Sequence, residues 1–421
     1  MPEKYGDRFL HYDALFSFLK GEKAVSGPLI NLSLSHLLST KYVISSLSSI
    51  PLGKIKKPVL SALLCAVSEL LFSEGTDDYA VCDSAVAYVK RKGLSGLSGF
   101  VNAIVRRAAR ERESLLKKIE GSEDPEIRFS LPKLILRSLE NDYGNEKAEL
   151  IEKAFFNRRF PHLFLPGLLE EPVKTIDSLS KKGFVLKKDD SRLPGYYLER
   201  SIEGKSIIAS EEFEKGLFYM MDRSSMADAE AFLDIKEELP EKPAVLDLCA
   251  APGGKSLCTA AIAHDSANID AFDISEEKVS LIRENTARLH IKSVKARVND
   301  ASIENQGLKN RYDLVLCDVP CSGFGVIGRK PSIRYRHDEN SLDSLLTLQR
   351  AIVKNAAAYI RQNGFLIYST CTLRKAENEG MADFIKNNFP EMRELSRKTF
   401  FPDEGDFDGF FTAVFQKGAL S

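Results

Sequence analysis

Two cysteine residues follow apolar runs that we expect to be buried strands. Cys321 comes four residues after the run 314–317, and Cys371 comes three residues after the run 365–368. Most structural cysteines lie inside an apolar stripe, but these two stand in polar turns. A thiol at the end of a strand can ionise, and a thiolate is a strong nucleophile. The pattern therefore predicts two thiols at the ligand-binding edge of a sheet.

The reaction that needs a thiol beside a methyl donor is methylation of a pyrimidine carbon. Carbon 5 of cytosine is a poor nucleophile until carbon 6 has been attacked, and a thiolate supplies that attack. Addition moves electrons towards nitrogen 3, where Asp318 is placed in the sequence to donate a proton or a hydrogen bond. A base then removes the carbon 5 proton, and a second thiol can assist the final elimination. The residues alone do not decide whether Cys321 or Cys371 attacks.

The segment 245–256 has the pattern of a buried strand, a loop of small residues and the start of a helix. Ligands of open α/β sheets bind at such loops. Gly253 and Gly254 let backbone approach a ligand closely, because no Cβ intrudes. The loop lacks both the Walker spacing and a G-x-G-x-x-G pattern, which argues against a phosphate cradle.

Two acidic residues at the ends of later strands refine this interpretation. Asp273 stands about 20 residues beyond the glycines, where an acid commonly accepts hydrogen bonds from ribose hydroxyls. Asp300 follows a further short strand, where its side chain could meet an adenine edge. Each acid alone could be an ordinary surface residue. Acid-tipped strands in this order indicate an adenosine cofactor.

These residues belong to a region with the pattern of a mostly parallel, doubly wound sheet. From residue 242 onward, short apolar runs alternate with helical segments. The expected strands are Ala244–Leu248, Ile269–Phe272, Leu314–Cys317, Phe365–Tyr368 and Phe411–Phe415. Residues 1 to about 120 instead show apolar stripes at helical spacing. Residues 124 to about 239 mix helices with strand-like pieces at 162–165 and 183–186.

Composition excludes several classes of protein. The seven cysteines form no Cys-x-x-Cys pair and are odd in number, so we expect neither a disulfide framework nor a metal site. No apolar run approaches the roughly 18 to 20 residues that span a bilayer. The first eight residues do not have the pattern of a secretory signal. We therefore expect a cytoplasmic protein without membrane contact.

Nucleic-acid binding would depend on local basic patches, because the net charge is −1. The stretch 86–118 carries nine Lys or Arg against two acidic residues and includes Arg106 and Arg107. A second basic stretch after Cys321 is interleaved with Tyr335, which could stack on a base. Its cations are Arg329, Lys330, Arg334 and Arg336. Phosphate contact is the functional interpretation of both stretches, and a solvated surface is the alternative.

Several motifs together resemble the RsmB/Sun family of RNA 5-cytosine methyltransferases. Residues 247–256, 318–323 and 369–372 resemble its cofactor, Pro-Cys and Thr-Cys motifs. The likeness extends through 325–331, 377–379 and 408–411 and covers roughly 215–417. The segment 96–107 resembles the NusB-like RNA-binding domain of the bacterial subgroup. Departures occur at 164–166, where the family usually has Arg-Val-Asn, and at 219–222.

The resemblance implies a role for each candidate residue. Cys371 would be the nucleophile and Cys321 would help to release the product, whereas in DNA 5-cytosine methyltransferases the Pro-Cys thiol attacks. The S-adenosylmethionine site would be lined by Cys249, Ala250, Ala251, Pro252, Gly253, Gly254, Lys255, Asp273, Asp300 and Asp318. RNA contacts would come from Arg106, Arg107, Arg329, Lys330, Arg334 and Arg336.

The resemblance also implies three domains and a substrate. These are an all-α NusB-like domain over 1–122, a small α/β linker domain over 123–239 and a Rossmann-like class I methyltransferase domain over 240–421. The expected substrate is a cytosine of 16S rRNA, free or within an assembling small subunit, and the expected enzyme is a monomer. The alternatives are the same chemistry on tRNA or 23S rRNA, and a non-catalytic RNA-binding assembly factor. A methyltransferase acting on a protein or a small molecule would not require paired thiols.

Overall fold

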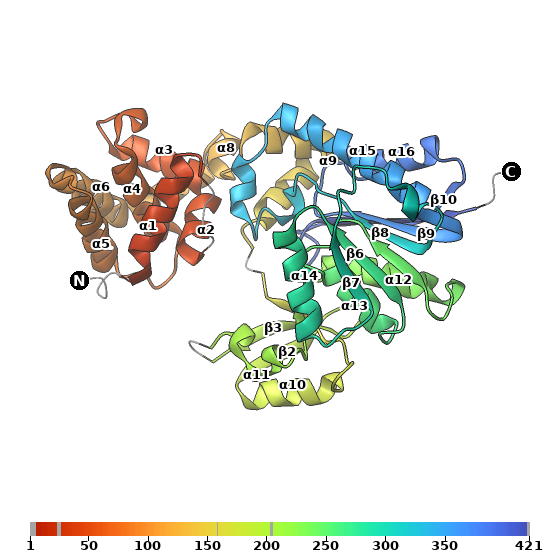
Figure 1. Cartoon of the computed structure of the whole chain (residues 1–421). Coiled ribbons are helices and arrows are strands. Elements are labelled where there is room, and N and C mark those ends of the chain that lie inside the picture. Colours follow the sequence, from red (N-terminus) through yellow and green to blue (C-terminus); the bar gives the residue numbers. More distant parts are fainter. Residues whose placement is uncertain (1–5, 23–26, 158, 203–204, 419–421) are drawn as a thin grey trace. The chain divides into compact units, whose positions relative to one another are not determined.

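The computed structural model describes residues 6–22, 27–157, 159–202 and 205–418, and Figure 1 traces their path. The chain divides into two compact units. The helical unit comprises Met1–Phe156 and Ile327–Arg336, and the second unit comprises Asn157–Val326 and His337–Ser421. Among the described residues, no helix is both long enough and apolar enough to cross a membrane.

The helical unit is a bundle packed around one apolar helix, α4 (Lys57–Phe72), which is buried on nearly all sides. Such a helix requires neighbours on every face. Its neighbours are α1 (Gly6–Leu19), α2 (Pro28–Ser35), α3 (Leu37–Leu47), α5 (Asp78–Arg91), α6 (Ser98–Arg110) and α7 (Arg112–Glu120). Helices α8 (Pro125–Arg128) and α9 (Lys133–Ala154) complete the unit. The prediction of an all-helical first domain is confirmed.

The boundary expected at residue 122 differs from this division. Helices α8 and α9 were assigned to the linker domain, but the structure groups them with the helical unit. Ser130 shows why, because its hydroxyl accepts a hydrogen bond from the backbone N–H of Leu38. The Ser39 hydroxyl in turn donates to the carbonyl of Ile127. These contacts join α3 to the chain around α8.

The segment 327–336 also packs within the helical unit. The hydroxyl of Tyr335, in the short helix η8 (Pro331–Tyr335), donates to the carbonyl of Leu34 at 3.0 Å, and its ring packs edge-on against Phe18. Arg334 is only 2% exposed, lies over the ring of Phe156 and donates to the carbonyl of Ile327. The expectation that Arg334 contacts RNA is therefore wrong for this structure, because its guanidinium is enclosed by protein.

The second unit begins with a small antiparallel sheet of order β2-β3-β1-β4. Its strands are β1 (His162–Phe164), β2 (Phe184–Lys188), β3 (Gly195–Ser201) and β4 (Tyr219–Met220), accompanied by α10 (Pro172–Lys181) and α11 (Glu211–Glu214). The strand-like pieces expected at 162–165 and 183–186 are confirmed as β1 and β2. Strands β3 and β4 were missed. Strand β3 pairs with β1 on one side and with β2 on the other, so it is a central strand of the sheet.

The larger sheet has seven strands in the order β10-β11-β9-β8-β5-β6-β7. They are β5 (Ala244–Asp247), β6 (Asn268–Asp273), β7 (Val294–Val298), β8 (Tyr312–Asp318), β9 (Ile360–Thr370), β10 (Met392–Phe400) and β11 (Phe410–Lys417). Strands β5 to β9 are parallel, and β11 and β10 are antiparallel at one side. The predicted doubly wound sheet is confirmed, and only β10 was not expected.

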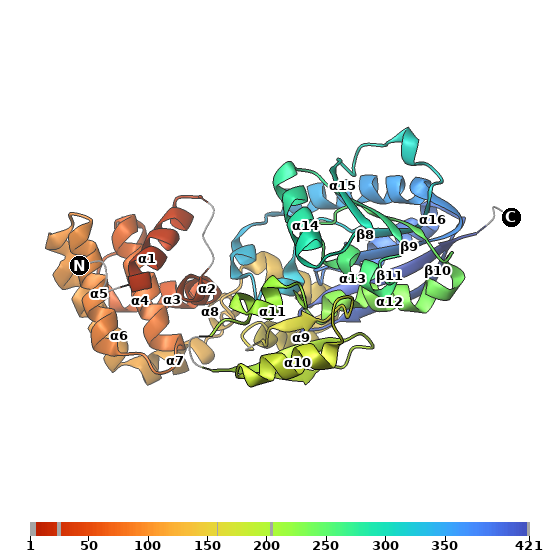
Figure 2. The same cartoon turned by 60° about the horizontal axis from the view of Figure 1, so that its bottom comes forward.

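Helices cover both faces of this sheet, as Figure 2 shows. One face carries α12 (Ala227–Ile235), α13 (Gly254–Ile262) and α14 (Glu276–Arg288), and the other carries α15 (Glu339–Tyr359) and α16 (Glu379–Asn388). Side chains alternate along each strand, so Val245 packs towards α12 and α13 while Leu246 packs towards α15 and α16. This burial on both faces explains the continuous apolar runs of the sequence.

Candidate active site

The carboxyl ends of four parallel strands lie at one edge of the seven-stranded sheet. Strands β5, β6, β8 and β9 end at Asp247, Asp273, Asp318 and Thr370. Parallel strands bring their carboxyl ends to the same edge, which is where ligands of such sheets bind. The predicted cofactor loop and both cysteines follow these strands directly. The fold therefore places the candidate residues together.

The loop after β5 is shaped by glycine. Gly253 has a φ of 112°, in the left-handed region that favours glycine, and α13 begins at the next residue. A Cβ at Gly254 would lie 3.2 Å from the ring of Tyr219, so this position is also crowded. Asp273 holds the loop, because its Oδ2 accepts a hydrogen bond from the N–H of Ala251 at 3.0 Å.

The neighbouring strand ends fit an adenosine group. Ile274, directly after Asp273, is 60% exposed although it is apolar, and Ile303 near Asp300 is also exposed. Asp300 accepts hydrogen bonds from the N–H and the hydroxyl of Ser302. Apolar side chains beside carboxylates suit a flat base carried on a ribose. Among the described residues, no group of three or more His, Cys, Asp or Glu could hold a metal ion.

The two thiols meet at the ends of β8 and β9. The sulfur atoms of Cys321 and Cys371 are 3.3 Å apart. The hydrogen bond with Cys371, together with burial, raises the pKa of Cys321 well above its ordinary value. A thiol at Cys321 can donate a hydrogen bond to a thiolate at Cys371 and stabilise its charge. This geometry allows one thiolate assisted by one thiol.

The turns that carry the thiols are fixed by buried hydrogen bonds. The hydroxyls of Ser322 and Thr372 are 2.7 Å apart, which joins the two turns. The carboxylate of Glu377 accepts a hydrogen bond from the N–H of Ser322 at 2.9 Å, and the side chain of Asn378 accepts one from Thr370. These buried hydrogen bonds hold the two turns, and therefore the two sulfur atoms, in fixed positions before any substrate binds.

A lysine and several carboxylates lie beside the thiols. Lys255, on α13, forms an ion pair with Asp318 and lies 5.2 Å from the centre of the Phe410 ring. Burial lowers the pKa of Lys255, but the neighbouring carboxylates outweigh it, so the pKa is raised. Burial raises the pKa of Asp247 to about 7. Lys255 therefore stays charged, and Asp318 is held where it can meet a bound base.

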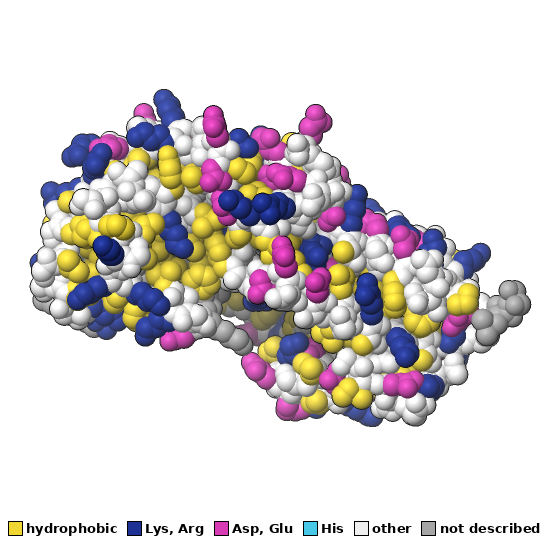
Figure 3. Space-filling model, turned by 90° about the horizontal axis from the view of Figure 1, so that it is seen from above, with side chains coloured by type: hydrophobic (Ala, Val, Ile, Leu, Met, Phe, Trp, Pro, Cys, Tyr) yellow, Lys and Arg dark blue, Asp and Glu magenta, His cyan; other side chains and the backbone are white. Residues whose placement is uncertain are grey.

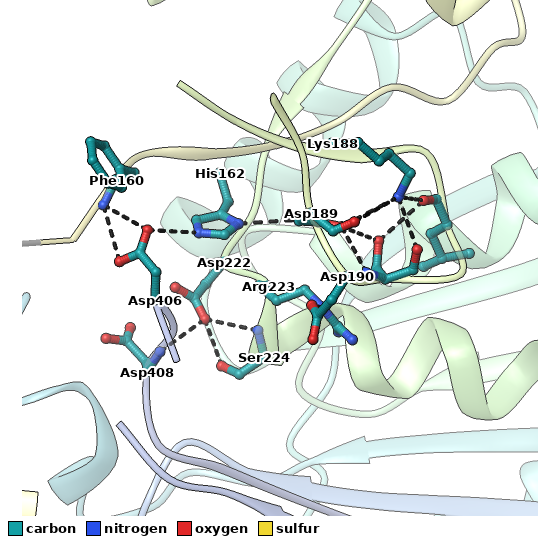
Figure 4. A network of polar contacts seen from close by, with 12 residues as sticks. Phe160, His162, Lys188, Asp189, Asp190, Asp222, Arg223, Ser224, Asp406 and Asp408 are labelled. Atoms are coloured by element: carbon teal, nitrogen blue, oxygen red, sulfur yellow. Dashed lines mark hydrogen bonds and ion pairs between the residues drawn. The ribbon is translucent and has the colours of Figure 1, made fainter. Parts of the chain in front are cut away.

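The loop 401–409, between β10 and β11, is linked to the turn of Cys371 through Gly325, whose N–H donates to the carbonyl of Cys371 and whose carbonyl accepts from the N–H of Gly409. Cys371 and Phe407 each pack against the buried cluster of Ala227, Phe400 and Phe410. The loop is tied to the small sheet by the polar network of Figure 4, in which His162 lies between Asp189 and Asp406, at 3.6 and 3.5 Å. Asp222 accepts a hydrogen bond from the N–H of Asp408 in the same network.

Three members of this site were missed in the sequence. They are Asp228 on α12, Thr412 on β11 and His162 on β1. A single acid in a helix is usually an exposed residue, and a threonine or histidine in a strand carries no spacing signal. Their partners come from elements far apart in the chain, so no local pattern could have identified them.

The candidate RNA-binding residues all lie in the helical unit. Arg106, Arg107, Arg329, Lys330 and Arg336 are exposed. Arg107 forms an ion pair with Glu111, one turn further along. Figure 3 shows Lys and Arg side chains spread among acidic and apolar side chains over one face, in keeping with a net charge near zero. Any RNA contact there depends on local groups of cations.

Comparison with known proteins gives two domain matches. Residues 234–416 match the family described as 16S rRNA methyltransferase RsmB/F, and residues 16–110 match the NusB family. A protein of Bacillus subtilis named probable ribosomal RNA small subunit methyltransferase B is 29% identical over 357 residues, which cover 83% of this chain and 77% of the relative.

Two solved structures share the fold. One, described as the crystal structure of PH0851, has a TM-score of 0.77 at 20% identity and covers 92% of this chain and 89% of that one. The other is NSun6 from Pyrococcus horikoshii with SFG, which has a TM-score of 0.61 at 22% identity and covers 69% of this chain and 99% of that one.

The fold and the loop after β5 define an S-adenosylmethionine-dependent methyltransferase. Within that class, the catalytic domain matches the RsmB/F methyltransferase family over residues 234–416, and a match to the NusB family precedes it. The resemblance found in the sequence is therefore confirmed.

Proposed function

We propose that this protein methylates carbon 5 of a cytosine in 16S rRNA, with Cys371 as the covalent nucleophile. The observation that carries the proposal is the pair of thiols 3.3 Å apart beside the ion pair of Lys255 and Asp318. Methylation of oxygen or nitrogen needs no thiol, whereas carbon 5 needs a nucleophile at carbon 6. The family of the catalytic domain supports an RNA substrate.

The family resemblance assigns the roles of the two thiols, and their hydrogen bond is compatible with that assignment. The Cys371 thiolate attacks carbon 6, and the Cys321 thiol, whose pKa is raised, stays protonated beside it. Asp318, held by Lys255, donates a proton or a hydrogen bond to nitrogen 3 as charge develops there. After methylation, Cys321 protonates the departing Cys371 sulfur as the product is released.

The cofactor would occupy the edge formed by the ends of β5, β6 and β7. The loop Cys249–Lys255 would contact the amino acid part of S-adenosylmethionine, Asp273 its ribose and Asp300 its adenine. The bound cofactor supplies the methyl group. The chain's own contribution is to hold the reacting atoms in line beside Cys371, which packs against the buried cluster of Ala227, Phe400 and Phe410.

The target base must leave its stack to reach Cys371, so the substrate is a single-stranded or loop cytosine. The exposed cations Arg106, Arg107, Arg329, Lys330 and Arg336 would bind the RNA backbone. The NusB family domain supports a ribosomal RNA over a tRNA.

The proposal is tested by incubating the protein with S-adenosylmethionine and 16S rRNA lacking 5-methylcytosine, then locating new 5-methylcytosine by bisulfite sequencing. We expect one modified position with the wild type and none with Cys371→Ala. Modification of tRNA or 23S rRNA alone would move the substrate to that RNA. No modification of any of the three, by a protein that binds S-adenosylmethionine, would contradict the proposal and favour a non-catalytic assembly factor.

A further inference from the structure

Asp228, on α12, is a buried carboxylate directly behind the ion pair of Lys255 and Asp318. It is 2% exposed. Its Oδ2 lies 2.5 Å from the Oγ of Ser369 and 3.9 Å from the Nζ of Lys255. Its Oδ1 accepts a hydrogen bond from the hydroxyl of Thr412 at 2.8 Å. The mechanism proposed above gives this acid no role, although burying it is costly.

The Ser369 hydroxyl stands between two carboxylates. Its Oγ lies 2.5 Å from Asp228 and 3.4 Å from the Oδ1 of Asp318. A serine hydroxyl has one hydrogen, so it donates to one carboxylate at a time. The other carboxylate can hydrogen-bond to the same oxygen only when it carries a proton itself. The three groups therefore form a chain along which one proton can pass.

The charges at the site favour the presence of that proton. Lys255 is one cation facing the carboxylates of Asp228, Asp318 and Asp247. Burial raises the pKa of Asp228 to about 6, against the lowering effect of Lys255, and the charge of Asp318 adds to the rise. Asp247, whose pKa is also raised by burial, adds a further negative charge nearby. The remaining polar contacts of Asp228 are its two neutral hydroxyl partners.

We propose that Asp228 is a positioning residue that supplies, through the Ser369 hydroxyl, the proton that Asp318 gives to nitrogen 3 of the target cytosine. The inference rests on the proposed function and extends it. It assigns a source to the proton that Asp318 passes to nitrogen 3.

The proton and the electrons balance in both directions. When the Cys371 sulfur bonds to carbon 6, the carbon 5–carbon 6 π pair moves between carbons 4 and 5. The carbon 4–nitrogen 3 π pair then moves to nitrogen 3, which takes the proton of Asp318. Asp318 takes the hydrogen of Ser369, and Ser369 takes that of Asp228. On elimination, the carbon 5 proton passes to water, the sulfur leaves, and nitrogen 3 returns its proton along the same chain.

The test compares the rate of covalent adduct formation in the wild type and in Asp228→Asn under single-turnover conditions. RNA with 5-fluorocytidine at the target position traps the adduct, because the fluorine blocks elimination. Asparagine keeps the size of the side chain but cannot release a proton. The ratio of the two rates cancels the ionisation of Cys371, which both proteins share.

We expect the wild type to be faster by about tenfold or more below about pH 6, a modest share of what general acids contribute. The ratio should fall towards one above about pH 8, because an ionised Asp228 has no proton to supply. A purely structural role would lower the rate of Asp228→Asn by the same factor at every pH. A ratio that does not change with pH therefore contradicts the inference.

Two further variants keep the test informative if Asp228→Asn folds poorly. Ser369→Ala removes the hydroxyl through which the proton passes, so this variant should show the same pH-dependent loss of adduct rate. Adding Asp228→Asn to Ser369→Ala should lower the rate no further. Thr412→Val leaves the three hydrogen-bonded groups in place but removes a donor that favours the ionised form of Asp228. The rate of adduct formation in this variant should therefore fall at a higher pH than in the wild type. Additive losses, or an unmoved profile in Thr412→Val, contradict the inference.

The outcomes also separate this inference from the proposed function. An adduct in the wild type with a flat ratio overturns the role of Asp228 and leaves the cytosine chemistry standing. No adduct in the wild type with 16S rRNA, 23S rRNA or tRNA overturns the proposed function, and the role of Asp228 falls with it. Calorimetric binding of S-adenosylmethionine by each variant serves as the check on folding.

Discussion

Gly325 lies where the turn after Cys321 meets both the turn of Cys371 and the loop 401–409. Its N–H donates to the carbonyl of Cys371 at 3.1 Å, and its carbonyl accepts from the N–H of Gly409 at 2.9 Å. A Cβ at residue 325 would lie 2.2 Å from the carbonyl oxygen of Gly409 and 2.9 Å from that of Cys371. The variant Gly325→Ala therefore forces these three backbones apart.

The size of the effect follows from these contacts. The shortest must open by about 1.2 Å to reach an ordinary 3.4 Å. Overpacking of this kind costs about 1–3 kcal/mol, and each weakened backbone hydrogen bond adds about 1 kcal/mol. We expect Gly325→Ala to lower the free energy of unfolding by about 2–5 kcal/mol. A shift of about 1 Å at Cys371 should slow adduct formation about 100-fold.

The assay combines urea unfolding followed by circular dichroism with the rate of adduct formation on RNA containing 5-fluorocytidine. Gly99→Ala is the matched control, because a Cβ at that position, in α6, meets nothing within 4 Å. If Gly325→Ala unfolds at the same urea concentration and reacts at the same rate as Gly99→Ala, the close packing described here does not position the thiols.

Three further predictions concern charged groups. Lys255→Met leaves buried carboxylates without a cation, so urea unfolding should show a loss of about 3–5 kcal/mol above about pH 7. That loss should shrink at acid pH, where Asp228, whose pKa is raised, takes up a proton; a loss independent of pH would count against this charge balance. Burial lowers the pKa of His162, but the surrounding carboxylates outweigh burial, so the pKa is raised. The wild type should therefore have a higher free energy of unfolding than His162→Gln below about pH 6.5. This difference should disappear as the pH rises. Arg106→Ala should reduce the slope of log affinity for RNA against log salt by about one, whereas Arg334→Met, which alters a buried cation, should not change it; equal slopes for both variants would refute the assignment.

The parallel strands could be predicted because they are buried on both faces and therefore appear as apolar runs. Strand β10 could not, since it pairs with β11 alone and its residues 393–398 are largely polar and exposed. Strand β3 was hidden because its first residue, Gly195, belongs to a stretch rich in turn residues. Its pairing with β1 depends on contacts between segments more than thirty residues apart.

The candidate site was predictable where a residue ends a strand or stands in the turn after one. Cys321, Cys371 and Asp318 all meet that condition, and the adjacency of β8 and β9 brings them together. Asp228 does not, because it lies in the helix α12, and its partners are on β9, β11 and α13. Arg334 shows the opposite error, since a basic residue in a polar segment was expected to be exposed, but it lies over Phe156.

The most direct test of the central claim is to map the covalent adduct. The wild type, Cys371→Ala and Cys321→Ala are each incubated with S-adenosylmethionine and 16S RNA carrying 5-fluorocytidine, and the cross-linked peptide is identified by mass spectrometry after nuclease and protease digestion. The account predicts an adduct on Cys371 in the wild type and in Cys321→Ala, and none in Cys371→Ala. An adduct on Cys321, persisting in Cys371→Ala, would contradict the assignment of the nucleophile.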